Sequence, residues 1–151
     1  MTPVLKLALI GHVIGGLIAL IFYYALVPSL VRKSLNLGFL TRFSLFGLVT
    51  LLISWVLAGY YYVTFYGQSV KPIIKSGKIP WAHNILMESK EHAFLFLPFL
   101  GLVLTTSLLF SKSDIAKDES LRKALAKLAF VLVFLGTAVT IFGVVISGAA
   151  K

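Results

Sequence analysis

The chain contains no cysteine and few charged residues, and each absence excludes a class of protein. Without cysteine there is no disulfide, no covalently attached c-type haem, no iron–sulfur cluster and no thiolate metal site. Charged residues make up 13% of the 151 residues, compared with roughly 25% in ordinary soluble domains. Hydrophobic residues make up 59%, and the mean hydropathy is +0.98. This composition is typical of a membrane protein, in which His, Glu, Tyr, Met or backbone atoms would hold any cofactor.

Acidic residues are also scarce, and the net charge is therefore +9. The basic residues form no long tract and fall at the ends of apolar runs. That placement favours contact with anionic lipid headgroups over contact with nucleic acid. We therefore expect a lipid bilayer, and no nucleic acid, as the chain's surroundings.

Four apolar stretches are long enough to cross a membrane, which requires about 20 residues in a helix. The expected helices cover residues 4–31, 43–66, 80–110 and 121–149. The third is extended back to Pro80, because proline suits the first turn of a helix. We predict an all-α, polytopic membrane protein in which residues 1–151 form one antiparallel four-transmembrane-helix bundle.

The distribution of Lys and Arg predicts the orientation in the cell membrane. The first and third connections carry eight of these residues, and the rest of the chain carries six. The eight are Arg32, Lys33, Arg42, Lys112, Lys117, Arg122, Lys123 and Lys127. By the positive-inside rule these two connections are cytoplasmic, and both termini lie outside.

Two histidines are the first candidates for a site, because ionisable groups inside a membrane are costly and usually functional. His12 and His92 each lie 20 residues before the basic residue at the cytoplasmic end of their spans. At about 1.5 Å of rise per residue, both are expected at one depth near the outer limit of the hydrocarbon. Counting in the same way places Tyr62 and Ser147 at that level on the other two spans.

Helical periodicity divides the start of the third helix into two faces. One face carries Asn84, Glu88, His92 and Leu95, with Glu91 at its margin, and the opposite face carries His83, Met87 and Lys90. The apolar continuation through Leu95 and Phe99 indicates that the Glu88/His92 face is the inner one. His83 would then face headgroups or solvent and have no cofactor role.

On the first span, His12 shares a face with Gly15 and Gly16. One interpretation is a seam of small residues for close helix packing, as in the motif Gly11-x-x-x-Gly15. The other is that a flat macrocycle lies against the backbone at Gly16, beside its histidine ligand. The residues alone leave both interpretations open.

Two histidines at one depth on nonadjacent helices can clamp one haem b from both sides. His12 and His92 are the predicted iron ligands, and Glu88 is a candidate acceptor for the second ring N–H of His92. Tyr62 and Tyr66 either belong to an interfacial belt or donate to a propionate, a quinone or an inward histidine. A second haem is not expected, because the fourth span has no histidine or carboxylate.

The stretch HVIGG, His12 to Gly16, followed by a histidine on the third of four spans, resembles the small membrane haem b proteins grouped around cytochrome b561, CopD and HemJ. The resemblance implies one noncovalent haem b near the outer face, with His12 and His92 as ligands. It covers little beyond the His12 neighbourhood and the general layout. Cytochromes b561 have four ligands for two haems, whereas this chain has three histidines, so electron transfer across the membrane is not implied.

Three functions remain open. The first is a membrane haem b protein, an oxidoreductase or an electron-transfer protein, that exchanges electrons at the outer face with quinol or a redox protein. The second is storage, transport or redox chemistry of a copper, zinc or iron ion, bound by Glu88, Glu91, His92, His12 and His83. The third is a non-catalytic accessory subunit or lipid-binding scaffold, within a homo-oligomer or a larger membrane complex. Hydrolysis is not indicated, because no nucleophile is arranged beside a histidine.

Overall fold

The chain folds into an antiparallel bundle of four long helices, α1 (Pro3–Val31), α2 (Leu37–Tyr61), α4 (Glu88–Phe110) and α6 (Glu119–Ala149). The computed structural model describes residues 1–32 and 34–150. Shorter helical segments connect the long helices: η1 (Tyr62–Val70), α3 (Lys71–Ser76), η2 (Ala82–Met87) and α5 (Lys112–Lys117). No strand occurs in the described ranges. The predicted all-α four-helix bundle is confirmed.

The helix bounds differ from the predicted spans mainly in the second span. It begins at Leu37 rather than at residue 43, because the Asn36 side chain caps it by accepting a hydrogen bond from the Phe39 N–H (2.9 Å). It also continues through η1 and α3 to Ser76, beyond residue 66. The third begins at Ala82 rather than at Pro80. Lys33 and Lys151, which the charge count includes, lie outside the described residues.

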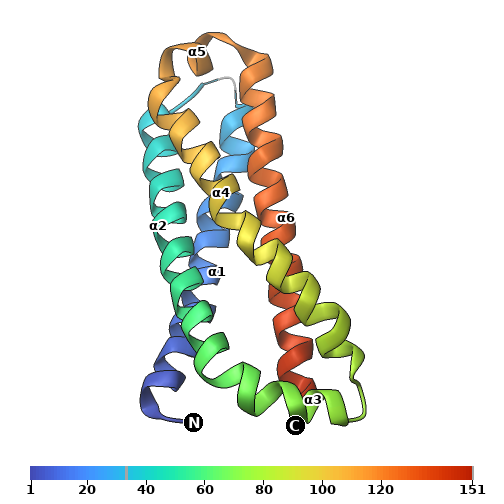
Figure 1. The fold of residues 1–151 in the computed structure, drawn as a ribbon. Coiled ribbons are helices and arrows are strands. Elements are labelled where there is room, and N and C mark those ends of the chain that lie inside the picture. The colour runs from blue at the N-terminus through green and yellow to red at the C-terminus, as the bar shows by residue number, and fades with distance from the viewer. Residues whose placement is uncertain (33, 151) are drawn as a thin grey trace.

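The four helices form a ring in the order α1, α2, α4, α6, with α6 packed against α1. Figure 1 shows both termini at one end of the bundle, together with α3, and α5 at the opposite end. It also shows α4 lying beside α2 near α5 and diverging from α2 toward the end with the termini. The bundle is therefore closed at the α5 end and splayed at the terminal end.

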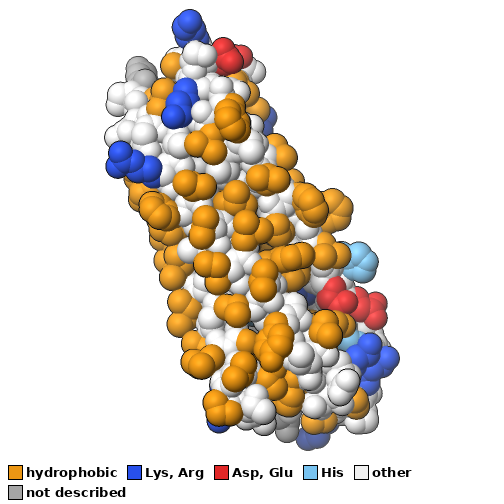
Figure 2. Space-filling model, turned by 60° about the vertical axis from the view of Figure 1, so that its left-hand side comes forward, with side chains coloured by type: hydrophobic (Ala, Val, Ile, Leu, Met, Phe, Trp, Pro, Cys, Tyr) orange, Lys and Arg blue, Asp and Glu red, His pale blue; other side chains and the backbone are white. Residues whose placement is uncertain are grey.

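The outer surface of the bundle is apolar. Large hydrophobic side chains are exposed along every long helix; Phe110 on α4, Val56 on α2 and Val144 on α6, for example, are 84%, 61% and 70% exposed. Figure 2 shows such side chains over the middle of one face, with basic side chains at both ends. Four helices are long and apolar enough to cross a membrane. The surface and the helix lengths together indicate that lipid surrounds the bundle.

Glycines allow close packing between helices. A Cβ on Gly11 would lie 2.7 Å from Leu57 Cδ1, and one on Gly15 would lie 3.3 Å from the Thr50 carbonyl oxygen, so α1 packs closely on α2. The seam of small residues anticipated for Gly11 and Gly15 is thus present. Further along, the fully buried Tyr23 side chain fits between Gly47 on α2 and Gly101 on α4.

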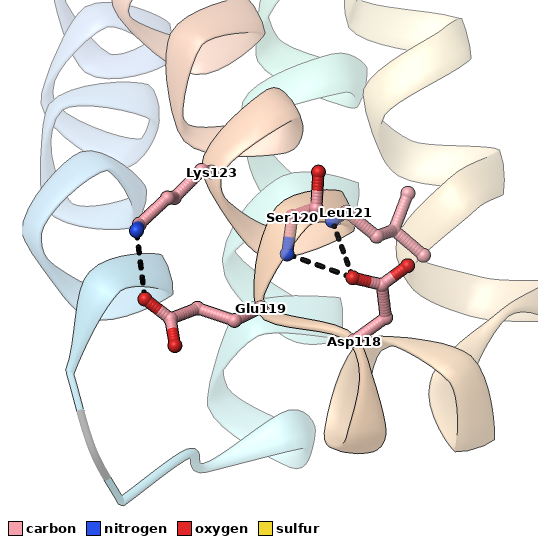
Figure 3. A network of polar contacts seen from close by, with 5 residues as sticks. All are labelled: Asp118, Glu119, Ser120, Leu121 and Lys123. Carbon is pink, nitrogen blue, oxygen red and sulfur yellow. Dashed lines mark hydrogen bonds and ion pairs between the residues drawn. The ribbon is translucent and has the colours of Figure 1, made fainter.

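An aspartate caps the start of α6. The Asp118 Oδ1 atom accepts hydrogen bonds from the N–H groups of Ser120 (2.7 Å) and Leu121 (3.1 Å) (Figure 3). We expect Asp118→Ala to lower the free energy of unfolding by about 1 kcal/mol. In thermal unfolding of the detergent-solubilised protein this corresponds to a Tm about 2–4 °C lower.

The neighbouring ion pair provides the control for the cap. Lys123 Nζ lies 2.7 Å from Glu119 Oε1, but both side chains are more than 60% exposed (Figure 3). Glu119→Gln should therefore lower Tm by less than Asp118→Ala does, because solvent screens exposed pairs. Equal losses in the two variants would contradict the importance of the cap.

Candidate functional site

The splayed half of the bundle contains two adjoining hollows. The inner hollow reaches Tyr23 in the middle of the bundle and has a volume of about 500 Å³. The outer hollow reaches Tyr66 near the terminal end and has a volume of about 690 Å³. They share one set of wall residues: Leu9, His12, Lys90, Phe94, Gly143 and Ser147. Both volumes lie within the roughly 300–1,000 Å³ that is typical of ligand pockets.

His12 is held in this shared wall by Ser54. The ring Nδ1 lies 2.9 Å from Ser54 Oγ and 3.2 Å from the Ser54 carbonyl oxygen. The Ser54 hydroxyl donates its proton to the His12 carbonyl oxygen (2.8 Å), so toward the ring it can only accept. The His12 Nδ1 must therefore carry a proton and donate it to Ser54, whose side chain is 2% exposed. In the neutral ring this leaves a lone pair on Nε2, for which the described residues provide no hydrogen-bond partner.

Aromatic rings line the wall beside His12. The Phe94 ring meets the imidazole edge to face, with centroids 6.2 Å apart, and the Trp55 ring stacks on Phe94 at 6.0 Å. The Trp55 Nε1–H is buried without a hydrogen-bond partner, as is the Glu91 Oε1 atom in the same outer hollow. The outer hollow thus has an aromatic wall, and two of its lining residues, Trp55 and Glu91, each carry a buried polar atom without a partner.

The inner face of the third span is the opposite of the one predicted. His83 is 1% exposed, Met87 is 9% exposed, and Lys90 borders both hollows. The predicted inner residues Asn84, Glu88, His92 and Leu95 are all exposed. The prediction failed because it took the apolar residues Leu95 and Phe99 as core, whereas they are 54% and 67% exposed, and Leu95 borders the outer hollow. In a membrane, apolar character does not distinguish the interior from the lipid-facing surface.

His92 therefore does not meet His12. It borders neither hollow, and its Nδ1–H donates to the backbone carbonyl of Glu88 at 2.7 Å rather than to the Glu88 carboxylate. The expectation that these two imidazoles face one another across the interior is wrong. Of the layer predicted from residue counting, His12, Tyr62 and Ser147 do border the outer hollow.

Tyr66 and His83 form a buried pair near the terminal end. The Tyr66 hydroxyl lies 3.0 Å from His83 Nδ1, and Tyr66 is 4% exposed. Tyr62 stacks on Tyr66 with centroids 5.4 Å apart and borders the outer hollow. Tyr66 and His83 belong to η1 and η2, whose wide π-helical turns are uncommon and often occur at functional sites. His83, expected at the surface, is instead the partner of an inward tyrosine.

The alternative ion site is not assembled. Within residues 1–32 and 34–150, no group of three or more His, Asp or Glu side chains is placed to hold a metal ion. Glu91 borders the outer hollow, whereas Glu88 and His92 are exposed and His83 is bound to Tyr66. Gly16 borders the inner hollow, and a Cβ there would lie 3.3 Å from Ser54 Oγ, so this glycine leaves room for the bond to His12.

Ser54 and Phe94 belong to the site but were not predicted from the sequence. Ser54 carries no signal on its own, because its role depends on an approach between α1 and α2. The inner stripe of the third span was detectable, since Gly101 follows Lys90, Phe94 and Leu97 at helical spacing and is buried. Small residues mark interiors in membranes better than apolar ones do.

Comparison of the chain with protein-family models, curated proteins and solved structures finds no match. The geometry of the site is therefore the basis for the functional proposal.

Proposed function

We propose that the protein is a membrane haem b protein that exchanges electrons near one membrane face, with quinol or a redox protein as partner. The observation that supports this is the state of His12. Its Nδ1–H is donated to Ser54, and its ring borders an apolar hollow with Nε2 unbonded. Neutral imidazoles oriented through their second ring nitrogen are the usual metal-binding form of histidine.

The residues present fit a haem held by one protein ligand, His12, because His92 lies on the outside of α4. The wall formed by Trp55 and Phe94 suits a flat apolar ring, and Tyr61 and Tyr62, which carry hydroxyl donors suited to propionates, border the same hollow. When bound, haem b supplies one-electron transfer. The chain itself orients the imidazole, excludes water with aromatic rings and places the site near the terminal end.

The orientation belongs to the same proposal. Eight of the fourteen Lys and Arg residues fall within residues 32–42 or 112–127 of the sequence. This bias supports a multi-pass protein of the cell membrane with both termini outside. The hollows would then lie in the outer half of the bundle, where a quinol in the outer leaflet can reach them.

An absorption spectrum of the purified full-length protein, oxidised and then reduced, tests the proposal. We expect a Soret band that is lost in His12→Ala and retained in His92→Ala, which is the matched control because it removes the same side chain from the outside. Circular dichroism and the elution profile should be unchanged in both variants. A colourless wild-type protein after expression with adequate haem, or an unchanged band in His12→Ala, would contradict the proposal. Loss of the band in both variants would contradict the single-ligand site.

A second candidate, an accessory subunit of a membrane complex, is favoured by an exposed polar stripe that runs from η2 into α4. The stripe consists of Asn84, Glu88 and His92, which are all exposed. Polar side chains that face lipid are costly. A partner that covers the stripe would remove that cost. The same purification distinguishes the candidates, because this one predicts a colourless chain that elutes within a larger assembly.

A further inference from the structure

Lys90 places a positive charge inside the bundle without a counter-charge. Its side chain borders both hollows, and its Nζ lies 3.1 Å from the position that a Cβ on Gly143 would occupy. Among the described residues, no carboxylate lies within 4 Å of it; the neighbouring Glu91 also fails to pair with it. An ammonium group in low-dielectric surroundings costs several kcal/mol unless an anion pairs with it. The site therefore favours an anion from outside the chain.

The inner hollow beside Lys90 is shaped for an apolar body. From Lys90 toward Tyr23 its walls are mainly aliphatic, with Leu20, Leu97 and Leu132 among them. Its volume of about 500 Å³ is that of a ligand pocket. Its rim includes side chains that are also exposed to the outside, Val13 and Leu17 on α1 and Val144 on α6. The hollow thus opens sideways between α1 and α6, toward lipid.

The geometry points to a binding site for an amphiphile with an acidic head. The carboxylate or phosphate of the head pairs with Lys90, and the hydrocarbon chain lies along the inner hollow toward Tyr23. Free fatty acids and anionic phospholipids both supply this chemistry. The site goes beyond the proposed redox function and does not depend on it, because the haem is assigned to the outer hollow.

Binding of defined amphiphiles to the detergent-purified full-length protein, measured by native mass spectrometry and calorimetry, tests the site. The probes are oleic acid, dioleoyl phosphatidylglycerol and, as an uncharged control, oleyl alcohol. We expect wild-type protein to bind one or both acidic probes and to bind oleyl alcohol at least about tenfold more weakly. Binding of only one acidic probe identifies the source of the head group. Equal affinity for oleic acid, phosphatidylglycerol and oleyl alcohol would overturn the inference, and this comparison requires no variant.

Three variants test whether Lys90 supplies the positive charge that binds the acidic probes. Lys90→Gln should weaken binding of the acidic probe about tenfold or more, and Lys90→Arg should retain it. Lys78→Gln, which removes an exposed lysine at the same end of the bundle, should leave binding unchanged. Undiminished binding by folded Lys90→Gln would overturn the inference. The absorption spectrum tests the haem proposal separately. A protein without haem that binds the acidic probes would still support the amphiphile site. A haem-loaded protein that binds no acidic probe would exclude the amphiphile site.

Discussion

Replacing Gly101 with alanine is expected to lower the free energy of unfolding by about 1–3 kcal/mol. A Cβ at this position would lie 2.5 Å from the Tyr23 hydroxyl oxygen, closer than any real contact. Tyr23 has little freedom to move away, because its ring is fully buried and also packs close to Gly47, where a Cβ would lie 3.2 Å from Tyr23 Cζ. At about 2–4 °C per kcal/mol, the loss is measurable as a lower Tm in thermal unfolding.

Tyr23→Phe should rescue this variant. The Tyr23 hydroxyl is buried without a hydrogen-bond partner, so its removal breaks no bond and costs little on its own. In the double variant the added methyl group on α4 takes the space that the hydroxyl leaves. A double-mutant cycle should therefore show a favourable coupling of about 1 kcal/mol or more.

Gly59→Ala is the matched control for Gly101→Ala. A Cβ at Gly59 would meet nothing within 4 Å, so the substitution should be neutral or stabilise the helix by about 0.5–1 kcal/mol. If Gly101→Ala behaves like Gly59→Ala, or if Tyr23→Phe fails to restore Tm, the close contact between α1 and α4 does not limit stability.

Replacing Ser54 with alanine is expected to weaken haem binding about 10–100-fold while leaving the bundle folded. The substitution removes the hydroxyl that accepts from His12 Nδ1 at 2.9 Å and donates to the His12 carbonyl at 2.8 Å. The Ser54 carbonyl alone, at 3.2 Å, then positions the ring. Titration of the apoprotein with haem, followed at the Soret band, measures the change.

The tautomer of the His12 ring can be measured independently, and a general loss of protein stability would not change it. The ¹⁵N chemical shifts of the ring should indicate a protonated Nδ1 in wild-type protein and a mixture of tautomers in Ser54→Ala. Ser107→Ala is the matched control, because the Ser107 hydroxyl bonds only within its own helix, to the Val103 carbonyl at 2.8 Å. Unchanged haem affinity together with an unchanged tautomer in Ser54→Ala would contradict the positioning role.

The four helices were predictable because the hydrocarbon thickness requires long apolar stretches. Such stretches are recognisable from their composition alone, whatever the order of their side chains. Counting residues also placed His12, Tyr62 and Ser147 at one level, since the rise per residue is nearly constant, and all three border the outer hollow. The rotation of each helix about its own axis was not predictable, as His92 demonstrates: it was expected inside the bundle and is exposed. A lipid-facing Phe99 and a core Leu97 are equally apolar, so hydropathy gives no information about which one points inward.

Contacts between helices were the other part that the sequence left undetermined. The bond between His12 and Ser54 joins residues 42 positions apart, and it exists because Gly15 allows α2 to approach α1. The pairing of Tyr66 with His83 likewise depends on how η1 and η2 pack. Such pairs become visible only when the helices are placed next to one another.

The packing of the bundle differs between its two ends, so the two halves of the protein along the membrane normal are not equivalent. Near α5 the four helices enclose a solid core that includes Leu30, Leu40 and Leu108, each at most 1% exposed. Both hollows lie in the other half. Hydrophobic molecules bound in these two hollows would therefore be drawn from one of the two monolayers, and exchange with the opposite monolayer would first require them to flip across the bilayer.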